Sequence, residues 1–452
     1  MTKPTPPLPP ARVLFPLGLG TALSLMGDST LYTVLPTPTA EAGIALGSVG
    51  IILGVNRAVR LFLNGPAGLA YDRWPRRRLF VPALFIGALS TAVYAATRGF
   101  WPLLVGRLLW GLAWSGIWVG GATVILDVTT VQDRGRWSGL YQTWFFLGAA
   151  LGAFAGGLLT DSVGYPMTMW IGAALTALGG LVALLWLPET RGGLAGGAAE
   201  GSSPREIPAE AGRPPCFARA NAGDPLAGRV VEGNSLREIP AEAGRPPCFV
   251  PPTGLRANRG LWVAASLQGI NRFVTAGVLA ATLGLVVRDR LQPAALGLGV
   301  ATLTGALMAG RTFFSMAAAP LAGTASDRLG SRWRVAAWAL AAGALSMVLV
   351  SWSTPVAILA GVALGAVTGG SVQGLTNALT GDLVSQAQRG RAIGLLHTAG
   401  DLGSAVGPSA AYALLPGLGL PGVYLLCAGL FAAGLGLVLW SESWRKGTGG
   451  GK

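Results

Sequence analysis

Two short polar stretches decide the fold of this chain, GLAYDRWPRRR at residues 68–78 and GTASDRLGSR at residues 323–332. Each follows a long apolar run, and each places an Asp-Arg pair four residues after a glycine. The two glycines, Gly68 and Gly323, lie 255 residues apart, and the same shift aligns further residues without gaps. It places Asp127 on Asp382, Arg134, Gly135 and Arg136 on Arg389, Gly390 and Arg391, and Gly139, Gly148 and Gly152 on Gly394, Gly403 and Gly407. The sequence therefore predicts two structural repeats.

The rest of the chain has the composition of a membrane protein. Of its 452 residues, 52% are hydrophobic and 12% are charged, whereas soluble domains contain about 25% charged residues. A helix needs about 20 apolar residues to cross the hydrocarbon core of a bilayer. Twelve such stretches follow one another, at residues 12–36, 44–69, 79–97, 101–125, 137–160, 166–187, 260–287, 294–321, 334–353, 355–379, 392–415 and 421–440. We therefore predict an all-α membrane protein with twelve transmembrane helices in two pseudo-symmetric six-helix bundles.

Arginines mark one side of this predicted membrane protein. They gather in the loops after the second, fourth, eighth and tenth stretches, whereas the loops at residues 37–47, 161–166 and 416–421 contain no Lys or Arg. Because cytoplasmic loops carry the positive excess, we expect both termini in the cytoplasm and a multi-pass protein of the plasma (inner) membrane. This topology also accounts for the net charge of +14, so we expect the lipid bilayer, and no nucleic acid, as a partner. The first apolar stretch is too long for a cleavable signal peptide.

A polar segment at residues 188–258 interrupts the apolar pattern and separates an N-terminal bundle, residues 1–187, from a C-terminal bundle, residues 259–452. It holds eight Arg and eight acidic residues, and the sequence REIPAEAGRPPCF occurs in it twice, at residues 205–217 and 237–249. This identity indicates a recent duplication or insertion, and the composition predicts a disordered cytoplasmic loop. Binding of a partner by this loop is the alternative.

The sequence lacks the usual signs of an enzyme. Its three cysteines, Cys216, Cys248 and Cys427, and its single histidine, His397, indicate neither a disulfide framework nor a metal site. The chain has no GxxxxGK[ST] phosphate-binding loop, which argues against an ATP-driven pump. No nucleophile-base pair or cofactor fingerprint is visible. We therefore expect no catalytic activity, no metal and no cofactor.

The two polar stretches resemble the GxxxDRxGxRR loop motif of the major facilitator superfamily of secondary transporters. Pro75 replaces the usual glycine in the first copy, whereas Gly330 keeps it in the second. In that family the loop acts as a cytoplasmic latch between the two halves. The resemblance implies this role for Gly68, Asp72, Arg73, Arg76, Arg77, Gly323, Asp327, Arg328 and Arg332. Anchoring at lipid headgroups would also explain the arginines, but it would not explain the spacing from glycine to aspartate.

Two further stretches resemble motifs of the same family. LLVGRLLWG at residues 103–111 is similar to the LxxxRxxxG pattern of proton-coupled members, and GAALGAFAGG at residues 148–157 is similar to the GxxxGPxxGG pattern of antiporters. In the second stretch Ala153 replaces the proline, and close helix packing explains the glycines equally well. The motif content is closest to that of proton-coupled drug and multidrug efflux members.

Ionisable side chains within apolar stretches are costly to insert, so they indicate functional sites. Asp28, Arg107 and Asp401 are our candidates for proton coupling, because family members often place an acid of the first helix near this arginine of the fourth. A permanent ion pair that holds helices together is the alternative. We expect Asp401 to pair with Arg272 or Arg311.

Further polar side chains are candidates for a substrate cavity. They are Arg57, Arg60, Gln142, Gln268, Asn271, Arg272, Arg311, Gln373, Asn377 and His397. Hydrogen bonds between helices are an ordinary alternative for the amides, and tight packing is the favoured one for His397. If the buried arginines face the cavity, their excess over aspartates favours an anionic substrate.

These observations predict a secondary transporter that moves a small solute by alternating access, driven by protons and in the direction of efflux. A proton symporter or facilitator for uptake of a nutrient or organic anion is one alternative. A non-transporting membrane sensor or scaffold is another. The expected partners are the lipid bilayer, a small-molecule substrate and protons, and the expected state is a monomer.

Overall fold

The computed structural model of the chain describes residues 9–130, 133–190, 229–232, 235–238, 258–291, 293, 297–352, 354–384 and 388–448. Residues 1–193 and 255–452 form one compact unit, and residues 194–254 form another. The first unit is helical throughout its described residues. The second contains one antiparallel hairpin, β1 (Arg229–Glu232) and β2 (Ser235–Glu238), in which Arg229 pairs with Glu238.

The first half of the helical unit runs through seven helices. They are α1 (Pro10–Val34), the short α2 (Thr39–Ala42), α3 (Leu46–Arg73), α4 (Arg76–Ala96), α5 (Phe100–Val128), α6 (Arg134–Val163) and α7 (Tyr165–Trp186). Proline lies in the first turn of α1 and α7, where its missing N–H leaves no bond unmade.

The second half begins with one continuous rod made of α9 (Arg259–Asn271), the π-helical η2 (Arg272–Leu279), α10 (Ala280–Val286) and the π-helical η3 (Val287–Leu291). It continues with α11 (Val300–Arg328), α12 (Arg332–Ser351), α13 (Pro355–Leu383) and α14 (Arg389–Thr448). The last helix bends at Gly419, whose φ of 62° is left-handed, and it contains two of the predicted stretches. All twelve predicted stretches therefore fall on helices, and the predicted fold class is confirmed.

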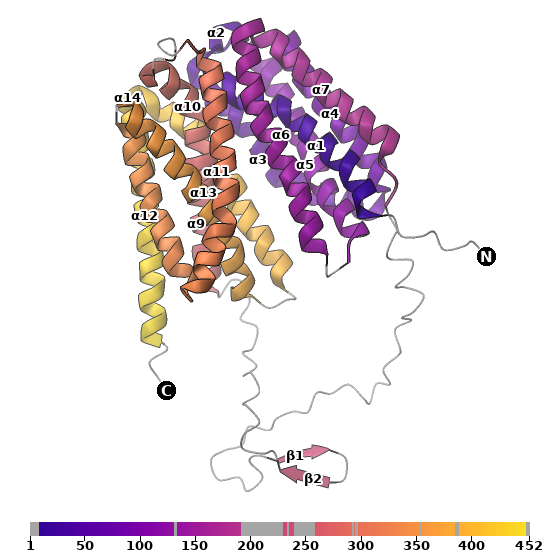
Figure 1. Cartoon of the computed structure of the whole chain (residues 1–452), viewed down its shortest axis with the longest axis vertical. Helices are drawn as coiled ribbons and strands as arrows, with labels where there is room; N and C mark the ends of the chain where they lie inside the picture. Colours follow the sequence, from indigo (N-terminus) through magenta and orange to yellow (C-terminus); the bar gives the residue numbers. More distant parts are fainter. Residues whose placement is uncertain are drawn as a thin grey trace, which may run out of the picture. The chain divides into compact units, whose positions relative to one another are not determined.

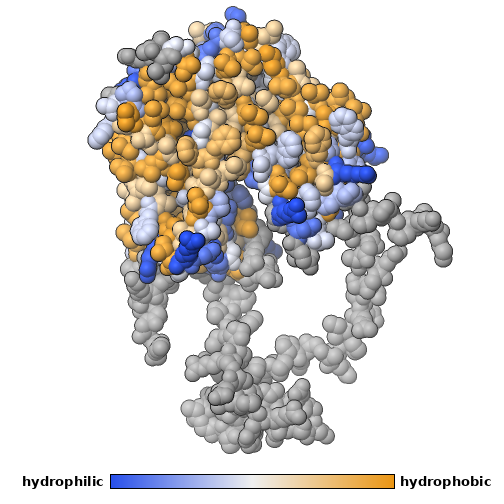
Figure 2. All heavy atoms as spheres, viewed as in Figure 1, coloured by the Kyte–Doolittle hydropathy of each residue, from blue (hydrophilic) through white to orange (hydrophobic). Residues whose placement is uncertain are grey.

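Nine helices in the described residues are long and apolar enough to cross a membrane, with the rod from α9 to η3 and the bent α14 each counted once. The long helices α1 and α11 are not among them, because glycines, hydroxyl side chains and a central ionisable residue, Asp28 in α1 and Arg311 in α11, lower their hydropathy. Apolar side chains cover the flanks of the helical unit in Figure 2, and polar ones gather at its ends. Phe62 and Val356, for example, are 77% and 79% exposed, which is the arrangement that a lipid environment favours.

The two halves meet through two pairs of helices, α3 with α14 and α6 with α11. Glycines allow this close approach. A Cβ atom at Gly54 would lie 2.3 Å from the carbonyl oxygen of Ala405, and one at Gly305 would lie 2.2 Å from that of Ala153. In Figure 1 the two sets of helices come together near α2 and diverge toward their other end, where Figure 2 shows a hollow between them. The unit is therefore closed at one end and open at the other.

The glycines of the predicted antiporter motif pack against neighbouring helices. Gly148 and Gly152 lie against Ala22 and Met26 of α1. Their repeat counterparts Gly403 and Gly407 make equally close approaches to α9 and η2. Close packing thus explains these positions in both halves.

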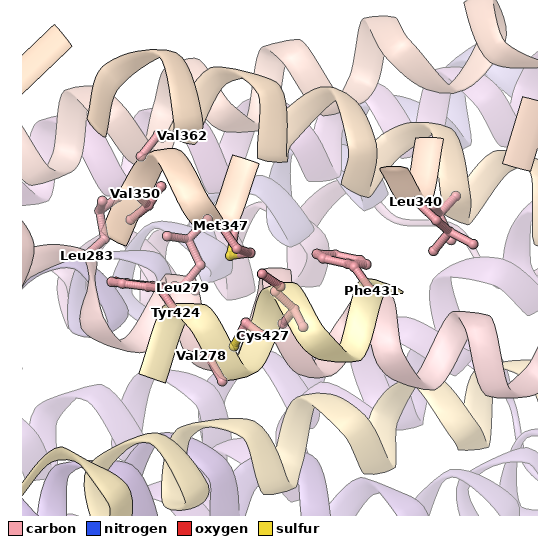
Figure 3. Packing of buried hydrophobic residues seen from close by; sticks show 14 of the residues in the cluster. Val278, Leu279, Leu283, Leu340, Met347, Val350, Val362, Tyr424, Cys427 and Phe431 are labelled. Atoms are coloured by element: carbon pink, nitrogen blue, oxygen red, sulfur yellow. The ribbon is translucent and has the colours of Figure 1, made fainter. Parts of the chain in front are cut away.

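The second half has a continuous apolar core (Figure 3). Val278 and Leu279 of η2, Met347 of α12 and Phe431 of α14 all contribute to it. Tyr424 is 1% exposed, and its hydroxyl shares a 2.6 Å hydrogen bond with that of Thr282. The core holds the rod from α9 to η3 against α12 and α14, which fixes the wall of the cavity described below.

The hairpin of residues 229–232 and 235–238 lies within the segment for which the composition predicts disorder, and that prediction stays a prediction for the segment as a whole. The first copy of the duplicated sequence, residues 205–217, lies outside the described residues, as does all of the second copy except its start in β2. The boundaries drawn at residues 187 and 259 stay a prediction.

Candidate functional site: a cavity between the two halves

A cavity of about 210 Å³ lies between the halves of the helical unit. Its walls come from α1, α3, α5 and α6 on one side and from η2, α10 and α11 on the other. Five of the predicted site residues line it: Asp28, Arg57, Arg60, Arg272 and Arg311. Two further ionisable candidates, Arg107 and Asp401, lie directly behind this lining, each bound to one of its members.

Asp28 and Arg107 form an ion pair in the first half, with 2.5 Å between Asp28 Oδ1 and Arg107 Nη1. The side chain of Arg107 is completely buried, whereas that of Asp28 is 14% exposed toward the cavity. Arg107 Nε donates to the carbonyl oxygen of Ile52 at 3.0 Å, and its guanidinium lies 4.9 Å from the ring centre of Tyr32. Of the two charged groups, only the carboxylate therefore reaches the cavity.

Tyr32 connects this ion pair to Arg57. The Arg57 guanidinium also lies 4.9 Å from the ring centre of Tyr32. Arg57 Nη1 donates to the carbonyl oxygen of Ala276 at 2.8 Å and to that of Ser404 at 3.4 Å. Since Ala276 and Ser404 belong to the second half, Arg57 links the halves through neutral acceptors.

Arg60 and Asp401 form an ion pair that joins α3 to α14. Their side chains are 14% and 16% exposed. The expected pairing of Asp401 with Arg272 or Arg311 is therefore wrong. The partner comes from the other half, because the close approach of α3 and α14 brings Arg60 within reach.

Arg272 and Arg311 lie on the wall that the second half contributes. Arg311 donates to the carbonyl oxygen of Thr275 and, at 3.7 Å, to the sulfur of Met308, while its Nε is buried without a partner. The Arg272 guanidinium makes no hydrogen bond or ion pair with any residue that the structure describes. Neither arginine has a carboxylate partner within the described part of the chain.

Positive charge therefore exceeds negative charge around the cavity. Asp28 and Asp401 form ion pairs with Arg107 and Arg60, whereas Arg57, Arg272 and Arg311 form no ion pair with a described residue, although Asp401 also lies within electrostatic range of Arg272. Charged groups in a poorly hydrated site are costly without a compensating charge. The cavity thus has the electrostatics of an anion site.

An aromatic wall faces the cavity from the first half. Trp110, Trp114 and Trp118 lie four residues apart on α5 and stack with 5.9 Å between successive ring centres. Phe145 of α6 lies 5.9 Å from Trp114, and the rings of Trp110, Trp114 and Phe145 line the cavity. None of these aromatic residues was predicted as a site residue, although a spacing of four places side chains on one helix face.

The other polar candidates do not line this cavity. Gln268 accepts a hydrogen bond from Thr376, and Asn271 donates to the carbonyl oxygen of Gly369, so both join α9 to α13. These are the hydrogen bonds between helices that the sequence left open as their alternative use. Gln142, Gln373 and Asn377 lie outside the cavity lining, on α6 and α13. His397 of α14 is exposed and lies within electrostatic range of Arg272, Asp401 and Arg60, so the tight packing favoured for it from the sequence is wrong.

The residues of the predicted latch make their ion pairs within one half. Arg76 Nε lies 2.8 Å from Asp127 Oδ2, and Arg332 Nε lies 2.6 Å from Asp382 Oδ2. Asp127 and Asp382 occupy the same place in the two repeats. A side chain at Gly68 or Gly323 would meet no described atom within 4 Å, so no described helix packs closely on these glycines while this end is open.

The closed end carries a contact between the halves that the sequence analysis did not include. Asp161, near the end of α6, accepts hydrogen bonds from the backbone N–H groups of Ala301 and Thr302 at the start of α11. Within the described ranges, no group of His, Cys, Asp and Glu side chains could hold a metal ion.

Comparison with known proteins places these features in a family. The chain matches the model of the Major Facilitator Superfamily over residues 17–251 and 261–447. The class B tetracycline resistance protein of Escherichia coli is 29% identical over 175 residues, which are 38% of this chain and 43% of that protein. A probable 4-methylmuconolactone transporter of Cupriavidus pinatubonensis is 30% identical over 140 residues, 31% of this chain and 33% of that protein. The chain thus matches less than half the length of either relative.

Solved structures resemble the whole chain. The human organic anion transporter MFSD10 superposes with a TM-score of 0.61 at 20% identity, covering 95% of this chain and all of that one. A bacterial homologue of the human lysosomal transporter Spinster, inward-facing and occupied, superposes with a TM-score of 0.68 at 14% identity, covering 98% of both chains. At these identities the likeness concerns the fold.

Proposed function

The chain belongs to the Major Facilitator Superfamily and is a membrane transporter of small solutes, and we propose that it exports its solute in exchange for protons by alternating access. Two bundles around one central cavity are the arrangement that alternating access requires. Each chain contains both bundles and the whole cavity, so the proposed working unit is a monomer, without a cofactor. The distribution of arginines supports a location in the plasma (inner) membrane with both termini in the cytoplasm.

The observation that carries the coupling is the asymmetric burial of Asp28 and Arg107. Arg107 is sealed from the cavity, and Asp28 reaches it. Protonation of Asp28 removes the negative charge from the pair, and deprotonation restores it. A carboxylate in this position can load a proton while the cavity is open to one side of the membrane and release it on the other side.

The direction of transport rests on likeness to other proteins. Residues 103–111 and 148–157 resemble motifs of proton-coupled members and antiporters, and the matched relatives include a tetracycline resistance protein and multidrug resistance protein 3 of Bacillus subtilis. Uptake is the competing direction, because the matched relatives also include a probable 4-methylmuconolactone transporter, whose name implies neither resistance nor efflux.

Proton flux in proteoliposomes tests the coupling. The purified full-length chain is reconstituted with a pH-sensitive dye inside, a proton gradient is imposed, and candidate solutes are added. We expect solute-dependent proton movement that is lost in Asp28→Asn and kept in Asp289→Asn, which removes an exposed carboxylate outside the cavity. Equilibration of labelled solute without proton movement would show a facilitator instead. Solute and protons moving in the same direction would show a symporter.

A further inference from the structure

We propose that the transported solute is a small aromatic anion, whose acid group binds Arg272 and Arg311 and whose ring lies against Trp110, Trp114 and Phe145. This inference rests on the proposed transport function and names its substrate class. It follows from the separate positions of charge and aromatic surface in one cavity.

The acid group is assigned to the arginines of the second half. Asp28 and Asp401 already have partners, in Arg107 and Arg60. Arg272 has no hydrogen bond or ion pair in the described part of the chain, and Arg311 keeps a buried Nε without a partner. Carboxylates and similar acids match the planar donor array of a guanidinium. A cationic solute would meet repulsion from the same groups.

Arg57 is less available to the acid group than Arg272 and Arg311 are. Two carbonyl oxygens and the ring of Tyr32 already occupy its guanidinium. Its positive charge therefore strengthens the field in the cavity, while its donors are less available than those of Arg272. The acid group is accordingly placed nearer to η2 and α11 than to α3.

The ring is assigned to the wall that the first half contributes. Trp110, Trp114 and Phe145 line the cavity, where Trp110 and Trp114 are 1% and 5% exposed and Phe145 is half-buried, and Trp110 and Trp118 both stack on Trp114. Offset or edge contacts between aromatic rings are favourable beyond the area that they bury. Because the acid and the ring bind different halves, a bound solute bridges the two bodies that move during transport.

The cavity has a size that suits a small solute. Its volume is about 210 Å³ in this conformation, below the roughly 300 Å³ at which pockets for drug-sized ligands begin. One ring with an acid substituent suits this space.

Direct binding tests this substrate class without any proton gradient. Isothermal titration calorimetry on the full-length protein in detergent measures the affinity for benzoate and for four comparison ligands. Benzamide is neutral and benzylamine is cationic, so they test the charge. Cyclohexanecarboxylate and inorganic phosphate are anions without an aromatic ring, so they test the ring. We expect benzoate to bind at least about tenfold more tightly than benzamide, since a hydrogen bond to a charged group is worth more than a neutral one. Benzylamine should not bind, and the other two anions should bind more weakly than benzoate.

Variants test the two walls separately. Arg272→Gln and Arg311→Gln should each weaken benzoate binding by about tenfold or more, whereas Arg288→Gln, which changes an exposed arginine of η3, should not. Trp114→Leu should weaken benzoate more than cyclohexanecarboxylate. Where a variant does not fold, the ligand series on the unaltered chain still decides the outcome.

The possible failures are distinct. Equal binding of benzoate and benzamide, or unchanged affinity in both arginine variants, overturns the anion site. Binding of phosphate or cyclohexanecarboxylate as tight as that of benzoate overturns the aromatic part. Benzoate binding with no proton flux leaves the substrate class standing and contradicts the proposed coupling. Proton flux that depends on Asp28 with a cationic solute contradicts the substrate class and leaves the coupling standing.

Discussion

The carboxylate of Asp161, near the end of α6, accepts hydrogen bonds from both the backbone N–H and the hydroxyl of Thr302, each at 2.6 Å. A side chain of one half therefore caps the first turn of α11 in the other half. The first N–H groups of a helix lack partners within the helix, and negative charge is favourable there. Since the bonded atoms belong to different halves, this contact is present only while this end of the protein is closed.

Removal of the Asp161 charge should favour opening at this end. We expect Asp161→Asn to shift the balance toward the open form by roughly 1–2 kcal/mol, because hydrogen bonds to a charged acceptor are worth about 1.5–3 kcal/mol and the amide keeps part of them. Distances between spin labels at Val163 and Leu298, which flank the contact and are 50% and 41% exposed, would measure the shift. An unaltered distance distribution would contradict this role, and Asp289→Asn serves as the control.

The ion pair between Arg60 and Asp401 should show strong coupling between its two members. Loss of one partner leaves a poorly hydrated charge uncompensated, which costs up to about 3 kcal/mol, discounted here for partial exposure. We expect Arg60→Gln and Asp401→Asn each to slow transport, and the double variant to be less impaired than the sum of both. The transport rates of these three variants and of the unaltered protein form a double-mutant cycle, which measures the coupling between the two residues. Purely additive losses would argue against the pair.

Replacement of glycine by valine should affect thermal stability at Gly54 of α3 but not at Gly68 of the same helix. Gly54→Val places a side chain against the carbonyl of Ala405, so it should separate α3 from α14, at a cost of about 1–3 kcal/mol, and lower the thermal stability of the protein. Gly68→Val meets no neighbour in this conformation and should leave thermal stability nearly unchanged.

The same Gly68→Val variant tests the predicted latch. If the loop at residues 68–78 packs closely when the open end closes, this variant should lose transport while its thermal stability in the present conformation stays the same. Gly429→Val is a matched control, because that glycine also has no described neighbour within 4 Å, is exposed, and lies outside both the motif and the cavity lining. Normal transport by Gly68→Val would leave only the anchoring role for this loop.

The central segment should be dispensable for transport. Replacement of residues 192–256 by a flexible Gly-Ser linker of equal length should leave solute-dependent proton flux within about twofold of the original, because every residue of the cavity lies outside that segment. A flux lost on replacement, with the helical unit intact by circular dichroism, would instead support the alternative in which this segment binds a partner.

The helices and the buried charged residues could be predicted from the sequence, but the side chains with which those residues pair could not. Depth along a helix can be counted from its ends, so Asp28, Arg57 and Arg311 were all placed at cavity level. The partner of Asp401 depends on which helices of the two halves touch, and no pattern within α14 records that. Asn271 and Arg272 are neighbours in sequence, yet one bonds to α13 and the other lines the cavity.

The π-helical turns of η2 are a second reason why the partners of the buried residues could not be predicted from the sequence. The face that a residue presents is normally deduced from 3.6 residues per turn, and a helix with i to i+5 hydrogen bonds departs from that period. Residues after Arg272 therefore fall on other faces than the sequence period indicates. The aromatic wall was within reach, since the tryptophans of α5 keep a regular spacing of four residues.

The surplus of arginine around the cavity has an electrical consequence. Arg57, Arg272 and Arg311 lie within the span of the membrane, where moving one elementary charge through the full potential changes its energy by about 2.3 kcal/mol per 100 mV. When the empty protein changes the side to which it opens, these charges shift relative to the field, whereas a bound anion cancels part of that shift. Membrane voltage should therefore act most strongly on the return of the empty carrier, and the resting potential of the cell would set the pace of that half of the cycle.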